Sequence, residues 1–234
     1  MRGNPPGLFI TGTDTGVGKT YIAAQVSMSL AHAGYRVGVY KPAASGCCVN
    51  STGGLISDDA VALWHAAGKP GDLEFVCPQR FAAPLAPHLA ATAEGKQIDR
   101  QLLRSGIDYW RKRSDVLIVE GAGGLLSPLS ETDFVADLAL EFGYPLVVVA
   151  ANRIGAINQV LQTLLVAKAF KQGLSVAGIV LNDVVNDETD LSRASNLSEL
   201  QRLCDCPVLA HVGFQQAIEE RDWMSLPKTA TLSH

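Results

Sequence analysis

The chain has 234 residues, of which 47% are hydrophobic and 18% charged, a composition that indicates a globular protein with one sizeable core and excludes a disordered one. Its formal net charge at pH 7 is −4, without a basic run, which argues against nucleic acid or an anionic membrane as the main partner. The start of the chain lacks a signal-peptide pattern, no apolar run approaches membrane-spanning length, and the five cysteines fit neither a zinc nor a disulfide framework, so we expect a cytoplasmic protein.

Nearly continuous apolar runs predict strands that are buried on both faces, as in a parallel sheet covered by helices. In chain order these runs are Leu8–Thr11, Arg36–Tyr40, Val116–Glu120, Pro145–Ala151, Val176–Leu181 and Pro207–Val212, with a shorter candidate at Glu74–Val76. Helical spacing of apolar residues predicts helices over Tyr21–Ala33, Asp58–Ala67, Asp99–Arg113, Asp133–Phe142 and Ile157–Gln172. Because no repeat or linker interrupts this order, we expect one domain over residues 1–234. Its fold is doubly wound α/β, with a mostly parallel sheet of about seven strands and helices on both faces.

A glycine-rich segment, Gly12–Thr20, follows the first predicted strand and leads into the first predicted helix. Backbone N–H groups in such a loop, together with the start of the helix, form a binding site for phosphate oxygens. Lys19 would reach the β- and γ-phosphates of a nucleotide, and the Thr20 hydroxyl would bind Mg²⁺. The segment departs from the standard motif in having its first glycine one position early, at Gly12. It predicts a fold of the P-loop NTPase type.

Further polar residues lie where parallel strands end, and so at the same edge of the sheet. Glu120 ends the third strand and precedes a glycine-rich run; an acidic residue here helps to hold Mg²⁺ in P-loop proteins, although a solvated carboxylate is the alternative. Lys41 ends the second strand, where it could stabilise charge on a transferring phosphoryl group; the alternative is a surface lysine. Asp58 fits a helix cap, which leaves Asp59 as a candidate metal ligand.

Six segments together resemble the dethiobiotin synthetase family and occur in that family's order. They are Gly12–Thr20, Tyr40–Gly46, Phe81–His88, Val119–Gly124, Gly155–Asn158 and Asn182–Asp183. The resemblance implies an ATP-dependent ligase of biotin biosynthesis. Its partners would be diaminopelargonic acid, CO₂ or bicarbonate, and ATP with Mg²⁺. The implied reaction carboxylates one amine, phosphorylates the resulting carbamate and closes a cyclic urea, giving dethiobiotin, ADP and phosphate.

The same resemblance implies roles for individual residues. Lys41 and Lys19 would be catalytic, and the Mg²⁺ ligands would be Thr20, Asp59 and Glu120. ATP would be bound by Gly16, Val17, Gly18, Lys19, Thr20, Tyr21, Asp59, Glu120, Gly121, Ala122, Gly123, Asn182 and Asp183. The substrate would be held by Thr15, Ser45, Pro84, Gly123 and Asn158. For Ser45 an ordinary turn, and for Asn158 a helix cap, are the alternative roles.

The implied assembly is a homodimer, in which the segment containing Asn158 meets the substrate carboxylate of the neighbouring subunit. That segment opens a predicted helix, so its free N–H groups could receive a carboxylate. One departure from the family follows the last strand, where Ala210–Phe214 replaces a Gly-x-Ile-Pro-like run near the base.

Two other functions use similar motifs. A P-loop amide-forming ligase of the cobyrinate-amidating kind needs a glutamine-hydrolysing domain, for which 234 residues leave no room. A ParA- or MinD-like ATPase switch carries an additional P-loop lysine where this chain has Asp14. Such a switch also needs a basic face or an amphipathic membrane helix, and Pro227 interrupts the only candidate for that helix. ATP hydrolysis that depends on a diamine and bicarbonate, or on DNA or lipid, distinguishes these functions.

Overall fold

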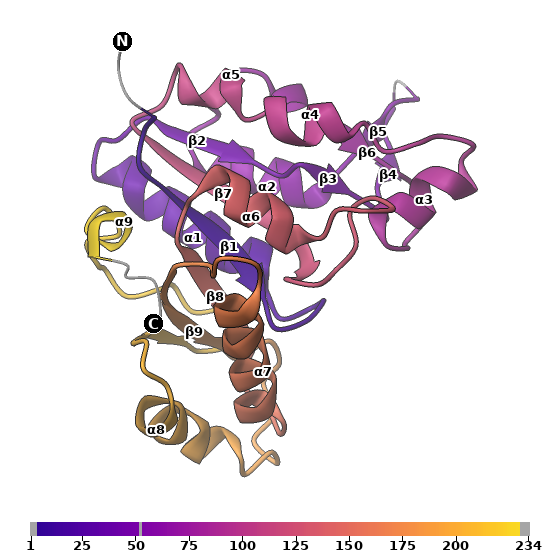
Figure 1. The fold of residues 1–234 in the computed structure, drawn as a ribbon. Coiled ribbons are helices and arrows are strands. Elements are labelled where there is room, and N and C mark those ends of the chain that lie inside the picture. The colour runs from indigo at the N-terminus through magenta and orange to yellow at the C-terminus, as the bar shows by residue number, and fades with distance from the viewer. Residues whose placement is uncertain (1–3, 52, 230–234) are drawn as a thin grey trace.

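A six-stranded parallel sheet forms the centre of the fold (Figure 1). The structure is a computed structural model that describes residues 4–51 and 53–229. The order of strands across the sheet is β10-β9-β8-β1-β7-β2. These strands are β1 (Gly7–Gly12), β2 (Val37–Tyr40), β7 (Val116–Gly124), β8 (Leu146–Ala151), β9 (Val176–Asn182) and β10 (Val208–Val212). From β1 the chain passes outward to β2, returns to β7 beside β1, and then crosses to β8, β9 and β10 on the other side, which confirms the predicted doubly wound α/β fold.

Helices cover both faces of the sheet, as predicted. In Figure 1, α6 (Val135–Phe142) and α7 (Ala156–Ala169) lie in front of the sheet, and α1 (Lys19–His32) lies behind it. The remaining helices are α2 (Asp58–Ala66), α3 (Pro87–Ala93), α4 (Arg100–Ser105), α5 (Asp108–Arg111), α8 (Arg193–Leu203) and α9 (Leu226–Thr229). No helix within the described residues is long and apolar enough to cross a membrane.

Short strand pairs outside the main sheet shape the region beyond β2. After β2 the chain forms β3 (Ala43–Ala44), which pairs in parallel with β6 (Gln79–Arg80). β4 (Cys48–Val49) forms an antiparallel pair with β5 (Leu55–Ile56). Every residue of β1, β8 and β9 is buried, which is why their sequences are continuous in apolar residues. The sheet therefore forms the core of the fold, and a functional site can lie at the edge where the carboxyl ends of its parallel strands meet.

The count of about seven strands was one too high for the main sheet. The run Glu74–Val76 was expected to be an edge strand, but the structure has a 3₁₀ helix over Leu73–Phe75. The backbone N–H of Phe75 donates to the Asp72 carbonyl, and Trp110 Nε1 donates to the Phe75 carbonyl. These bonds satisfy the backbone without a neighbouring strand.

The helix expected over Asp99–Arg113 is divided into α4 and α5. Gly106 lies at the division, and a Cβ there would be 2.4 Å from the Tyr40 hydroxyl oxygen. That hydroxyl lies 3.0 Å from the carbonyl oxygens of both Leu102 and Leu103. The Leu102 carbonyl also accepts the helical bond from the Gly106 N–H at 3.0 Å, and the Tyr40 side chain of β2 thus contacts α4 at its last turn.

Candidate active site

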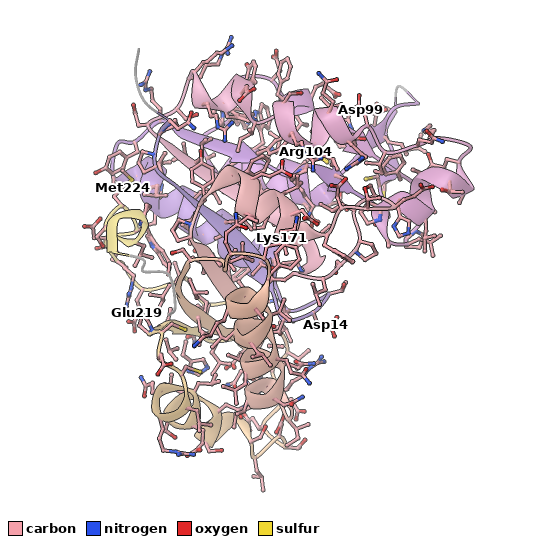
Figure 2. All side chains as sticks on the ribbon, in the orientation of Figure 1. Asp14, Asp99, Arg104, Lys171, Glu219 and Met224 are labelled. Atoms are coloured by element: carbon pink, nitrogen blue, oxygen red, sulfur yellow. The ribbon has the colours of Figure 1, made fainter. Side chains whose placement is uncertain are left out.

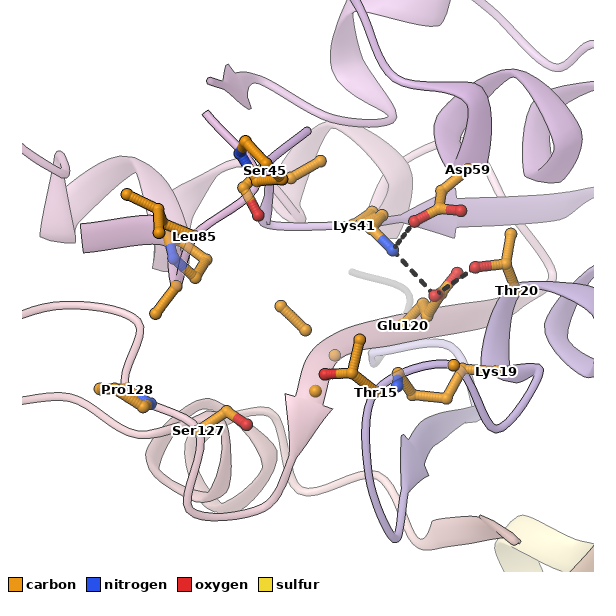
Figure 3. A pocket seen from close by; sticks show the side chains of 18 of the residues that line it. Thr15, Lys19, Thr20, Lys41, Ser45, Asp59, Leu85, Glu120, Ser127 and Pro128 are labelled. Carbon is orange, nitrogen blue, oxygen red and sulfur yellow. Dashed lines mark hydrogen bonds and ion pairs between the residues drawn. The ribbon is translucent and has the colours of Figure 1, made fainter. Parts of the chain in front are cut away.

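A cavity of about 660 Å³ opens at the carboxyl edge of the sheet (Figure 3). It lies between the loop after β1, the ends of β2 and β7, and a segment at residues 84–87. Most of the predicted site residues line it. These are Thr15, Gly16, Gly18, Lys19, Thr20, Lys41, Ser45, Asp59, Pro84, Glu120, Gly121, Ala122 and Gly123. The structure thus brings together residues from five separate parts of the chain.

The loop between β1 and α1 adopts the conformation that its glycines permit. Gly16 has φ +76° and Gly18 has φ +90°, values that residues with a Cβ rarely adopt. Lys19 Nζ turns back and donates to the Asp14 carbonyl at 2.9 Å. Asp14 Oδ1 in turn accepts from the Thr15 N–H at 2.7 Å. At the position where switch ATPases carry a second lysine, this chain therefore has a carboxylate that stabilises the loop.

Lys41 lies at the centre of a buried ionic group. Its Nζ is 2.8 Å from Glu120 Oε1 and 2.5 Å from Asp59 Oδ2. The side chains of Lys41 and Glu120 are 5% and 1% exposed, whereas that of Asp59 is 45% exposed. Burial disfavours the Lys41 ammonium, but the two carboxylates outweigh this effect and raise its pKa. Lys41 is thus a fixed cation rather than a proton donor at neutral pH.

The carboxylates and the Thr20 hydroxyl form an oxygen-rich group beside Lys41 (Figure 3). Thr20 Oγ1 donates to Glu120 Oε1 at 2.7 Å. The second oxygen, Glu120 Oε2, is buried and has no hydrogen-bond partner among the described residues. An unpartnered buried carboxylate oxygen beside a hydroxyl and a second carboxylate fits a hard divalent cation such as Mg²⁺.

The buried ionic group around Lys41 also influences the pKa values of Asp59 and Lys19. Burial raises the pKa of Asp59, but the Lys41 ammonium outweighs it, so the net shift is downward. Burial is also the largest influence on Lys19, and it lowers the pKa of that ammonium. The cavity therefore holds two cations and two carboxylates at close range, ready to receive a charged ligand.

The far part of the cavity is less polar. The Gly46 N–H donates to the Ala83 carbonyl, and a Cβ at Gly46 would lie 3.6 Å from Pro84 Cβ. These contacts bring Ser45 and Pro84 to the same wall. Sequence reasoning missed further lining residues, namely Ala44, Leu85, Ala86, Pro87, Ser127 and Pro128. Ala44, Leu85, Ala86 and Pro87 lie inside two of the segments that resemble the family, whereas Ser127 and Pro128 stand three and four residues after the glycine run that ends at Gly124.

Several predicted nucleotide-binding residues support the P-loop from behind and do not line the cavity. Val17 is buried in the core, and its carbonyl accepts a hydrogen bond of 3.0 Å from Asn182 Nδ2. A Cβ at Gly18 would lie 2.1 Å from that same nitrogen. The hydroxyl of Tyr21 donates to the Gln216 carbonyl at 2.8 Å, which ties the start of α1 to the segment after β10.

Asp183 and Asn158 also lie outside the cavity lining. Asp183 forms an ion pair of 2.6 Å with Arg193 and is 3.1 Å from His211 Nε2. Burial opposes the charge of Asp183, but Asn152, His211 and Arg193 together lower its pKa. Asn158 is an exposed residue in the first turn of α7.

Comparison with known proteins places this site in a family. A family model described as an AAA domain matches residues 6–221. The protein named ATP-dependent dethiobiotin synthetase BioD from Rhodopirellula baltica is 42% identical over 214 residues, which cover 87% of this chain and 82% of that protein. Its namesake from Pseudescherichia vulneris is 35% identical over 230 residues, which cover 96% and 93% of the two chains.

Solved structures agree on the fold. A ParA family ATPase from Chlorobium tepidum superposes with a TM-score of 0.53 at 16% identity and covers 94% of this chain and 86% of its own. At that identity the likeness concerns the fold alone. The motifs, the P-loop geometry and the close relatives agree, and the chain belongs to the dethiobiotin synthetase family of P-loop NTPase-type proteins.

Proposed function

We propose that this chain is an ATP-dependent dethiobiotin synthetase, a ligase that acts as one domain over residues 1–234 in the cytoplasm. The observation that carries the proposal is the buried Lys41 with its two carboxylates, held opposite a P-loop in one cavity. That arrangement suits phosphoryl transfer to an anionic acceptor. The relatives' printed name, ATP-dependent dethiobiotin synthetase, supports the reaction.

The proposed reaction has three bond-forming steps. One amine of diaminopelargonic acid attacks CO₂, forms a C–N bond and loses a proton, which gives a carbamate. A carbamate oxygen then attacks the γ-phosphorus of ATP, so a P–O bond to ADP breaks and a carbamoyl phosphate forms. The second amine attacks the carbamoyl carbon, phosphate leaves, and a proton is released as the cyclic urea closes.

The two lysines supply the positive charge that the second step requires. An anionic carbamate approaches a triphosphate, and positioned cations stabilise the charge that develops between them. Lys19 extends from the P-loop and Lys41 from the end of β2, and both line the cavity. Lys41 is held by Glu120 and Asp59, so little reorganisation is needed when the acceptor arrives.

Mg²⁺ is part of this proposal. Thr20, Asp59 and Glu120 would hold the ion, because their oxygens form the group with the unpartnered Glu120 Oε2. When bound with ATP, Mg²⁺ neutralises phosphate charge. The nucleotide phosphates would lie on Gly16–Thr20, and the adenine would lie toward Asn182 and Asp183, with Tyr21 holding the adjoining segment.

The diamine end would contact Thr15, Ser45 and Gly123, with Pro84 beside its methylene chain. Its distant carboxylate would reach Asn158 of a second copy, since Asn158 does not line this cavity. Asn158, Leu161 and Leu165 follow helical spacing along one side of α7, and Leu161 and Leu165 are 36% and 66% exposed. Ile154, in the turn just before the helix, is 78% exposed. An exposed apolar stripe that contains Asn158 supports a homodimer formed through α7.

Phosphate release from Mg·ATP and bicarbonate tests the proposal. We expect release to depend on the diamine, with an organic product that has the mass of the cyclic urea. Release that is indifferent to the diamine, without a cyclic product, would contradict the substrate assignment. Asn158→Ala should raise the diamine KM without changing the ATP KM, and an unchanged diamine KM would contradict the shared carboxylate site.

A further inference from the structure

Ser127 lines the cavity and is fixed there by its own loop. Its Oγ accepts a hydrogen bond of 2.9 Å from the Gly124 N–H, and its N–H donates to the Gly124 carbonyl at 3.1 Å. The Ser127 carbonyl accepts from the Val135 N–H at 3.0 Å. Three bonds therefore hold the residue between the end of β7 and the start of α6.

The hydroxyls of Ser127 and Thr15 both lie close to Gly123, which has no side chain. A Cβ at Gly123 would lie 2.2 Å from Ser127 Oγ and 3.7 Å from Thr15 Oγ1. Since Gly123 has φ +73° and no side chain, both hydroxyls are open to a ligand that lies on its backbone. In Figure 3, Ser127 and Thr15 lie on one side of the cavity, and Ser45 and Lys41 lie on the other.

The loop that carries Ser127 is anchored outside the cavity. Asp133 is buried and accepts from Arg100 Nε at 2.5 Å, from Arg104 at 2.8 Å and from Ser130 Oγ at 2.6 Å. The Leu129 N–H also donates to the Asp133 carbonyl at 2.8 Å. These contacts position the Ser127 hydroxyl before any ligand binds, as a precise binding contact requires.

We propose that the Ser127 hydroxyl hydrogen-bonds one of the two amine nitrogens of the diamine. This inference rests on the proposed function and names a further residue of that site. A serine oxygen has two acceptor lone pairs, of which the Gly124 N–H takes one. The second can accept an amine N–H, which orients the nitrogen while leaving its lone pair free to form the new C–N bond.

The test compares wild type with Ser127→Ala and Ser127→Thr against three ligands. These are the diamine and the two monoamine analogues that lack one or the other amino group, with affinity measured by competition or calorimetry. Loss of one hydrogen bond should weaken the diamine about five- to tenfold in Ser127→Ala. The analogue that keeps the contacted nitrogen should weaken equally, the other should not change, and Ser127→Thr should restore binding.

A merely structural role would give a different pattern. Equal weakening of both monoamines, or no weakening of the diamine, would overturn the proposal. Ser198→Ala is the control, since Ser198 is exposed on α8, its hydroxyl donates to the Ser195 carbonyl and it does not line the cavity; it should leave the affinity for all three ligands unchanged. If wild type forms no cyclic urea, the proposed function fails. If wild type does form the cyclic urea, but Ser127→Ala binds all three ligands as tightly as wild type does, only the Ser127 assignment fails.

Discussion

Replacing Lys41 with methionine should destabilise the fold as well as stop the reaction. The substitution keeps most of the side-chain volume but removes the cation from Glu120, whose side chain is 1% exposed. Glu120 would then be a buried charge without a counter-ion, with only the neutral Thr20 hydroxyl among the described residues donating to it. A buried charge without a counter-ion is among the most costly defects in a protein interior.

The distances set the size of the effect. At the observed 2.8 Å between Lys41 Nζ and Glu120 Oε1, Coulomb attraction at an effective dielectric constant of about 20 is about 6 kcal/mol. Part of that attraction offsets the cost of burying both ions, and breaking a buried pair typically costs about 3–5 kcal/mol. The Asp59 pair adds little to this figure, because Asp59 is 45% exposed and screened by water.

Urea unfolding followed by circular dichroism measures this loss. Lys41→Met should lose about 3–5 kcal/mol of unfolding free energy, and the double variant with Glu120→Gln should recover most of it, because the orphaned charge is gone. Turnover should fall by at least about 10²–10³-fold in both variants. Lys112→Met, on an exposed residue, is the control and should change stability by less than about 0.5 kcal/mol. If Lys41→Met matched wild type in stability, or if the double variant did not regain stability, the ionic group would not have the role described.

Three other outcomes follow from the structure. Gly18→Ala should abolish ATP binding in calorimetry, because its Cβ would lie 2.1 Å from Asn182 Nδ2. Gly34→Ala is the control and should bind ATP normally, because Gly34 has the similar φ of +87° but a Cβ there would have no atom within 4 Å. Equal loss of ATP binding in both variants would refute the clash. Arg100 above all, then Arg104 and Ser130, hold the pKa of Asp133 below its ordinary value of 3.8, against the effect of burial. The Asp133 carboxylate therefore stabilises the fold at pH values above 3.8, and this stability is lost as pH falls through the lower folded pKa. The difference in unfolding free energy between wild type and Asp133→Asn should shrink as pH falls below about 4. A difference independent of pH would exclude this linkage. Leu165→Glu should convert a dimer to a monomer in light scattering and raise the diamine KM; a dimer that persists would place the interface elsewhere.

The sequence predicts the sheet and the shared edge of the site well, for a physical reason. Strands buried on both faces must be apolar at nearly every position, and parallel strands end at one edge. The residues at or near the carboxyl ends of β1, β2 and β7 therefore meet in space, although Lys19, Lys41 and Glu120 are far apart in the chain. Local pattern and topology together are sufficient for these residues.

Features that depend on one distant contact could not be predicted in the same way. The Tyr40 hydroxyl lies beside Gly106 where α4 and α5 are divided, and helical spacing carries no information about this contact. Likewise, the end of β9 predicts where Asn182 lies, but not that its amide holds the Val17 carbonyl. Ser127 was missed because its role comes from the turn that returns it over Gly123.

The path of one oxygen atom tests whether ATP phosphorylates a carbamate at this site. If ATP phosphorylates a carbamate beside Lys41, an oxygen of CO₂ becomes the bridging oxygen of the carbamoyl phosphate and leaves with phosphate. Bicarbonate labelled with ¹⁸O, used within seconds so that exchange with water is small, should place one labelled oxygen in each phosphate released, as measured by mass spectrometry. Released phosphate without label, alongside a labelled cyclic urea, would contradict carbamate phosphorylation and with it the proposed use of this site.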